Sequence, residues 1–103
     1  MMTVQLDPQN TETVALFEYA GSLRGQHVLE IGCGDGRLTR RYAAHPARVT
    51  AIDPNPDKIA LACENLPIDL RTRVEFIATD IVQFGSEHRG NERFDLAILA
   101  WSL

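Results

Sequence analysis

The feature that most constrains this chain is a short apolar run that leads directly into three glycines at alternate positions. Residues 27–31 read His-Val-Leu-Glu-Ile, and Gly32, Gly34 and Gly36 follow. Residues without a Cβ are needed where the backbone bends sharply or a ligand approaches it closely. A helix is expected to open near Asp35, and a helix start offers N–H groups to a carboxylate or phosphate. The pattern predicts a strand, a ligand-binding bend and a helix. The alternative is a tight turn that binds nothing.

Further segments alternate between strand and helix character, which predicts an α/β class. The predicted strands cover residues 27–31, 48–52, 74–78 and 94–100. Crossovers of a dozen or more residues favour parallel pairing. Asn55 and Pro56 predict a helix start, and the apolar residues that follow at helical spacing are Ile59, Ala62, Cys63 and Leu66. A turn is expected at Asp80, followed by a polar stretch over residues 85–93.

The beginning of the chain predicts a helical segment. Asp7 is a candidate cap and Pro8 suits the first turn. Leu16, Ala20 and Leu23 then recur on one face. Residues 1–25 are therefore expected to form an N-terminal helical segment of a single domain spanning residues 1–103.

Charge and cysteine content limit the partners of the protein. The net charge of -4 argues against a broad phosphate-binding face. The spacing of Cys33 and Cys63 matches neither a zinc site nor a redox motif, so we expect free thiols in a reducing compartment and a cytoplasmic location. No histidine has a partner at ligand spacing, and no metal site is expected. No apolar run approaches the ~18 residues of a membrane span.

Glycine spacing and acidic residues bear on the ligand. A dinucleotide fingerprint is Gly-x-Gly-x-x-Gly, but here the third glycine comes one position early and Arg37 stands where Gly or Ala is expected. Glu30 would repel a pyrophosphate and would suit a ligand with an ammonium and a sulfonium. Asp53, at the end of the second predicted strand, can accept hydrogen bonds from both ribose hydroxyls. The alternatives are that Glu30 is a solvated strand-end carboxylate and that Asp53 merely begins a turn.

The motif Glu30-x-Gly32-x-Gly34-x-Gly36, with Asp53 and Asp80 in register, resembles the signature of class I methyltransferases that use S-adenosylmethionine. The resemblance runs from about residue 26 to residue 103. It implies a Rossmann-like parallel sheet of about four strands in the order 3-2-1-4, flanked by helices. That sheet is incomplete beside the family's seven strands. S-Adenosyl-L-methionine is the implied cofactor, and the implied cofactor-binding residues are Glu30, Gly32, Cys33, Gly34, Asp53, Pro54, Asp80, Ile81 and Ala100.

The resemblance also implies individual roles. The glycine loop and its acidic residue surround the methionine end of the cofactor, and Asp53 matches the acid that binds the ribose. Asp80 and Ile81 match the positions that meet the adenine. Ala100 and Trp101 fall where a loop passes close to the transferred methyl group. The alternatives are a turn or cap role for Asp80, a packing role for Trp101, and a small packing residue at Cys33.

Methyl transfer is therefore the leading hypothesis, with an unknown acceptor, a small molecule being slightly favoured. No catalytic residue is identified. A second hypothesis is a half-domain that binds the cofactor without turnover. A third is an NAD-dependent oxidoreductase, against which Glu30 and the shifted glycine argue. Four strands in the order 3-2-1-4 would leave residues 94–100 at an edge, which suggests a fragment of a longer chain, a homo-oligomer or a completing chain.

Overall fold

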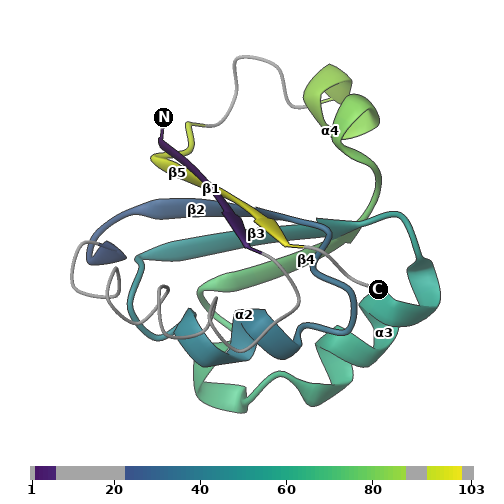
Figure 1. Ribbon diagram of the computed structural model, residues 1–103. Helices are drawn as coiled ribbons and strands as arrows, with labels where there is room; N and C mark the ends of the chain where they lie inside the picture. Colours follow the sequence, from purple (N-terminus) through teal and green to yellow (C-terminus); the bar gives the residue numbers. More distant parts are fainter. Residues whose placement is uncertain (1, 7–22, 88–92, 101–103) are drawn as a thin grey trace.

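A five-stranded parallel sheet forms the centre of the computed structural model, which describes residues 2–6, 23–87 and 93–100 (Figure 1). The strands lie in the order β1-β5-β2-β3-β4, and all neighbouring pairs are parallel. Their bounds are β1 Met2–Leu6, β2 His27–Ile31, β3 Arg48–Asp53, β4 Val74–Ala78 and β5 Leu96–Ala100. Strands β4-β3-β2-β5 reproduce the predicted order 3-2-1-4, so the predicted fold class is confirmed.

Helices cover both faces of the sheet. Figure 1 shows α2 (Arg37–Tyr42) and α3 (Pro56–Asn65) on one side and α4 (Ile81–Glu87) on the other. A short 3₁₀ turn, η2 (Ile68–Leu70), follows α3. Helix α4 was not expected, because only a turn and a polar stretch were predicted in that region. In the described part of the chain, no helix is long and apolar enough to span a membrane.

The start of α3 follows its sequence signal. The side chain of Asn55 accepts hydrogen bonds from the backbone N–H groups of Asp57 and Lys58. Pro56 occupies the first turn, where a missing N–H is harmless. Of the predicted apolar stripe on this helix, Ile59 and Ala62 are buried, as is Leu66 just beyond its end, whereas Cys63 is exposed.

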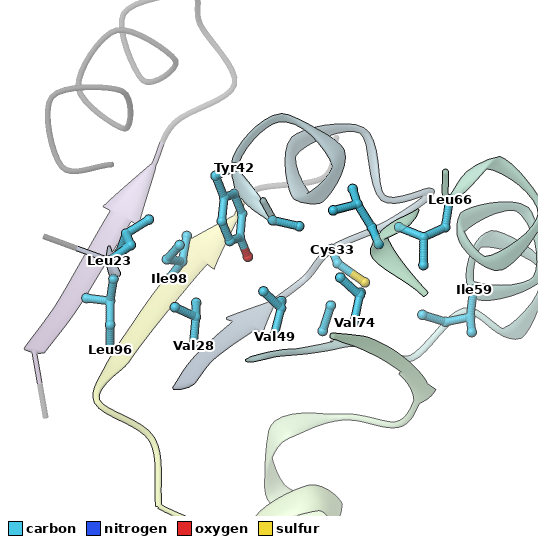
Figure 2. Packing of buried hydrophobic residues seen from close by; sticks show 13 residues of the cluster. Leu23, Val28, Cys33, Tyr42, Val49, Ile59, Leu66, Val74, Leu96 and Ile98 are labelled. Carbon is cyan, nitrogen blue, oxygen red and sulfur yellow. The ribbon is translucent and has the colours of Figure 1, made fainter. Parts of the chain in front are cut away.

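Alternation along the strands divides the core between the two faces. Val28 and Val49 belong to a large cluster with residues of α2 and α3, part of which Figure 2 shows. Leu29 and Ile52 belong to a smaller cluster with Phe84 of α4. Strands β2 and β3 therefore have buried side chains on both faces of the sheet, and the bend follows directly from the buried strand β2.

The expectation that residues 94–100 form an edge strand is wrong. Strand β5 pairs with β2 on one side and with β1 on the other, from Met2 opposite Leu96 to Leu6 opposite Ala100. The backbone groups of β5 are therefore satisfied within the chain, and the argument for a partner strand at residues 94–100 no longer holds.

The expected N-terminal helical segment also needs correction at its beginning. Residues 2–6 form strand β1 rather than part of a helix. The physical reason is that the backbone N–H and C=O groups of β5 can hydrogen-bond with residues 2–6 as a neighbouring strand, which no local sequence pattern reveals. The rest of the predicted helix, residues 7–22, lies outside the described residues.

Candidate functional site

The predicted site residues lie at the carboxyl-terminal ends of the parallel strands, which together form one edge of the sheet. The glycine bend, residues 32–36, follows β2, Asp53 ends β3 and Ala100 ends β5. Asp80 comes two residues after the end of β4. The chain leaves β2 in one direction across the sheet and returns to its other side as β5. Ligands of open α/β sheets bind outside the carboxyl ends of the strands at such a switch point.

Two glycines of the bend are required by the packing of the chain on itself. Gly32 has φ +82°, and a Cβ on it would collide with the carbonyl oxygen of Ala100. Gly36 has φ +81°, and its Cβ would lie 3.1 Å from both Cβ of Ala62 and Cζ of Phe76. Gly32 thus lets β2 and β5 meet at the switch point, and Gly36 lets the start of α2 approach α3 and β4.

The first backbone N–H groups of the bend are hydrogen-bonded within the chain. Those of Gly32 and Cys33 donate to the carbonyl oxygen of Ile52 at 2.8 and 3.0 Å. Gly34, with φ +57°, donates to Oδ2 of Asp53 at 2.9 Å. The carboxylate predicted to bind a ribose therefore also anchors the bend.

Two N–H groups at the start of α2 are occupied as well. Gly36 donates to the carbonyl oxygen of Cys33 at 3.0 Å, and Arg37 donates to Oδ1 of Asp35 at 3.2 Å. The expectation of free N–H groups for an anion is therefore wrong at these positions, because the chain's own carbonyl and carboxylate oxygens fill them. A diphosphate would have to displace these acceptors.

Asp53 is held by the backbone on both oxygens and is only 6% exposed. Oδ2 accepts from Gly34, and Oδ1 accepts from the N–H of Asn55 at 2.9 Å. The alternative interpretation, that Asp53 begins a turn, is therefore confirmed, because Asp53 begins the turn before α3. Each oxygen keeps a further lone pair with which it can accept a hydrogen bond.

Glu30 lies beneath α2 with no exposed surface. Its Oε1 accepts hydrogen bonds from the hydroxyls of Thr39 and Tyr42, each at 2.7 Å. Its Oε2 is buried and has no partner among the described residues. The alternative of a solvated strand-end carboxylate is therefore wrong. Desolvation raises the pKa of Glu30 above its ordinary value of 4.5, and the two hydroxyl bonds oppose this only in part.

The Glu30 carboxyl affects two neighbouring groups. Burial raises the pKa of the Cys33 thiol, and the charges of Glu30 and Asp53 raise it further. Cys33 also lies in the large hydrophobic cluster, which agrees with a packing role, and a buried thiol of this kind is inert. Burial, followed by the charge of Glu30, raises the pKa of Tyr42. Figure 2 shows Tyr42 reaching from α2 toward the sheet and Cys33 between the layers.

The remaining predicted residues lie at the surface of the same edge. Asp80 is exposed, and its Oδ1 accepts from the N–H of Gln83 at 2.7 Å, so it caps α4. Ile81 is 44% exposed at the first position of that helix, and Pro54 is exposed beside Asp53. Trp101 lies outside the described residues. Across residues 2–6, 23–87 and 93–100, no three His, Cys, Asp or Glu residues are placed to hold a metal ion.

Thr39 and Tyr42 are the site residues that the sequence analysis missed. They stand three positions apart on α2, so they share one face of the helix. Both are buried against Glu30. The signal was a pair of hydroxyls three positions apart in the predicted helix.

Comparison with known proteins agrees with this geometry. A family model described as a methyltransferase domain matches residues 28–103. The trans-aconitate 2-methyltransferase of Klebsiella pneumoniae is 34% identical over 101 residues, which are 95% of this chain and 38% of that protein. The magnesium-protoporphyrin O-methyltransferase of Rhodobacter capsulatus is 34% identical over 79 residues, 77% of this chain and 35% of that protein.

A solved structure extends the likeness to the fold. The SAM-dependent methyltransferase from Thiobacillus denitrificans, in complex with S-adenosyl-L-homocysteine, is 25% identical with a TM-score of 0.65. The match covers 92% of this chain and 38% of that one. The chain thus spans little more than a third of the length of these relatives. Sequence and fold together show that the chain belongs to the methyltransferase domain family.

Proposed function

We propose that this chain binds S-adenosyl-L-methionine at the carboxyl ends of β2, β3 and β4 and serves methyl transfer. The observation that carries the proposal is the bend, in which the chain's own oxygens accept from the N–H groups of Gly32, Cys33, Gly34 and Gly36; Asp53 supplies one of these oxygens. Because a diphosphate would have to displace these acceptors, the bend is unfavourable for it, and the Asp53 carboxylate favours a cationic nucleoside.

The residues of this edge fit the parts of such a ligand. The spare lone pairs of Asp53 would accept from the ribose hydroxyls, and Glu30, buried beneath the bend, would help to orient the methionine end. Asp80 and Ile81 would meet the adenine. The remaining residues proposed to line the cofactor are Gly32, Cys33, Gly34, Pro54 and Ala100.

Positioning is the contribution that we assign to the protein. S-Adenosylmethionine supplies an electrophilic methyl group on a sulfonium, so the reactivity belongs to the cofactor. The bend and Asp53 would hold that cofactor in one orientation, and orientation alone can lower a barrier by several kcal/mol. We assign no catalytic base.

The relatives support a small-molecule acceptor. Trans-aconitate and magnesium protoporphyrin appear in the names of two of them. The bound S-adenosyl-L-homocysteine in the Thiobacillus denitrificans structure supports the cofactor. We place the protein in the cytoplasm because Cys33 and Cys63 are unpaired.

Titration calorimetry with S-adenosylmethionine, S-adenosylhomocysteine and NAD tests the proposal. We expect the first two ligands to bind more tightly than NAD. Asp53→Ala should weaken their binding by about 5- to 150-fold, equivalent to ~1–3 kcal/mol of lost hydrogen bonding. Asp69→Ala, which removes an exposed carboxylate of η2, is the matched control and should bind normally. Tighter binding of NAD, or unchanged affinity in a folded Asp53→Ala variant, would overturn the proposal.

A further inference from the structure

Arginines gather at the amino-terminal edge of the sheet, where the parallel strands begin. Arg93 and Arg24 come three residues before β5 and β2, Arg48 is the first residue of β3, and Arg73 directly precedes β4. These four strands are neighbours in the sheet and all run in the same direction. The arginines therefore lie along one edge, opposite the edge that carries the proposed cofactor site.

Contacts between the loops hold three of these arginines close to one another. An isolated β-bridge joins Arg24 to Pro46. Nη1 of Arg73 donates to the carbonyl oxygen of Pro46 at 3.1 Å. The N–H of Val49 donates to the carbonyl oxygen of Arg73 at 2.7 Å, and Arg48 directly precedes Val49. The backbones of Arg24, Arg48 and Arg73 thus meet around the turn before β3.

Most of the guanidinium groups at this edge are available to a ligand. Arg24, Arg48 and Arg93 are exposed, as is Arg71 in the turn before β4. Within residues 2–6, 23–87 and 93–100, these four guanidinium groups make no hydrogen bond or ion pair. A guanidinium offers its donors in a planar fork that fits a phosphate. We call Arg24, Arg48, Arg71, Arg73 and Arg93 the amino-edge strip.

Acidic side chains near the strip are fewer than its arginines. In the described chain they are Asp69 of η2, Glu75 of β4 and Asp95 before β5, all of them exposed. Oδ2 of Asp95 accepts from the N–H of His27 at 2.8 Å. The edge is therefore positively charged, although the net charge of the chain is -4. Such a strip attracts anions locally.

Two rings lie among the arginines. The His27 and Phe94 rings have centroids 4.4 Å apart and planes inclined at 52°, and both residues are half-buried. His27 lies opposite Arg48 in the register of β2 and β3, and Phe94 follows Arg93. Basic groups combined with aromatic rings suit single-stranded nucleic acid, whose phosphates need cations and whose bases stack. An acidic peptide would use the arginines alone.

The size of the sheet separates this edge from the proposed cofactor site. Neighbouring strands lie about 4.8 Å apart, so the beginnings of four strands span about 15 Å. Strands of five or six residues, at about 3.3 Å per residue, put the strip about 16–20 Å from the opposite edge. A strand on the strip would therefore leave the cofactor site accessible.

We propose that the amino-edge strip binds single-stranded nucleic acid. Its exposed arginines contact the phosphates, and the ring pair of His27 and Phe94 stacks with a base. The bound strand is not the methyl acceptor, because it lies at the wrong edge of the sheet. The inference does not depend on the proposed function, since it uses no residue of the cofactor site.

Fluorescence anisotropy with a labelled oligouridine RNA of about ten nucleotides tests the charge of the strip. For four phosphate contacts, the logarithm of the affinity should fall with the logarithm of salt concentration with a slope of about -3. Binding should weaken about 50-fold between about 50 and 200 mM salt. Arg48→Gln and Arg71→Gln should each weaken binding and reduce the slope by about 0.7. Arg37→Gln, an exposed control beyond the bend, should match wild type.

The ring pair is tested by Phe94→Leu, which removes a stacking surface and no charge. Binding should weaken about fivefold or more while the salt slope stays that of wild type. A glutamate-rich peptide of equal charge should compete poorly for the strip. If Phe94→Leu does not fold, the arginine variants and the peptide still decide the question.

Several results would overturn the proposal. They are absence of binding at about 50 mM salt, an equal loss in Arg37→Gln and Arg48→Gln, and unchanged affinity in a folded Phe94→Leu variant. Tighter binding of the glutamate-rich peptide would make the strip a site for acidic protein segments instead. Competition between the RNA and S-adenosylhomocysteine would place the strand at the other edge of the sheet. We expect the two ligands to bind independently.

Discussion

Replacing Gly36 by alanine measures how far the bend depends on bare backbone. Gly36 has φ +81°, and an L-residue in the left-handed region costs about 1–2 kcal/mol. The new Cβ would also lie 3.1 Å from Cβ of Ala62 and from Cζ of Phe76. Overpacking of this kind costs about 1–3 kcal/mol. Together, the two effects should lower the free energy of unfolding by about 2–5 kcal/mol.

Two other glycines separate the contributions. Gly25 has φ +77°, but no atom lies within 4 Å of an added Cβ, so Gly25→Ala should cost only the conformational part, about 1–2 kcal/mol. Gly85 lies within α4, has no positive φ, and an added Cβ also meets nothing within 4 Å. Gly85→Ala should therefore stabilise the protein by about 0.5–1 kcal/mol.

Urea unfolding followed by circular dichroism gives the measurement. With a slope of about 2 kcal/mol/M, Gly36→Ala should lower the midpoint by about 1–2.5 M. The excess over Gly25→Ala is the packing part. If both variants lose the same stability, the contacts of Gly36 with α3 and β4 do not matter, and the packing argument for this glycine is refuted.

Two further predictions concern Glu30 and Asn55. Burial raises the pKa of Glu30 in the folded protein above 4.5. The contribution of Glu30 to the free energy of unfolding is therefore complete below pH 4.5 and is lost as pH rises through the folded-state pKa. The loss is at most about 1.4 kcal/mol per pH unit. Urea unfolding of Glu30→Gln between about pH 5 and pH 8 should show a smaller loss than wild type, with Glu64→Gln as control; parallel curves would contradict the neutral acid. Asn55→Ala removes the cap of α3 and should cost about 1 kcal/mol, whereas Asn65→Ala at its other end should change stability by less than about 0.5 kcal/mol. Equal losses in the two Asn variants would count against the cap.

Several features of the fold were predictable because they depend on neighbours along the chain. Alternation and apolar runs identified the four strands that became β2 to β5, and Asn55 with Pro56 marked the start of α3. Helix α4 was missed because its only local signals were the cap at Asp80 and a few apolar residues before a polar stretch.

The pairing of β1 with β5 was out of reach of such signals. Met2 lies opposite Leu96, at the other end of the chain, and no local pattern in either segment indicates that the two would pair. Pairing between such distant segments depends on which backbone groups the rest of the sheet leaves open. For this reason the prediction that residues 94–100 form an edge strand was wrong.

The sequence by itself determined that a bare-backbone bend follows a strand, with acidic residues before and beyond it, because glycine and carboxylate chemistry are properties of the residues. Only the tertiary structure decided how these groups are used. It turned Glu30 inward onto two hydroxyls of α2, tied Asp53 to Gly34, and set Gly32 against Ala100. These contacts join segments that meet only when the sheet forms, and burial in that sheet is what changes the proton affinity of Glu30.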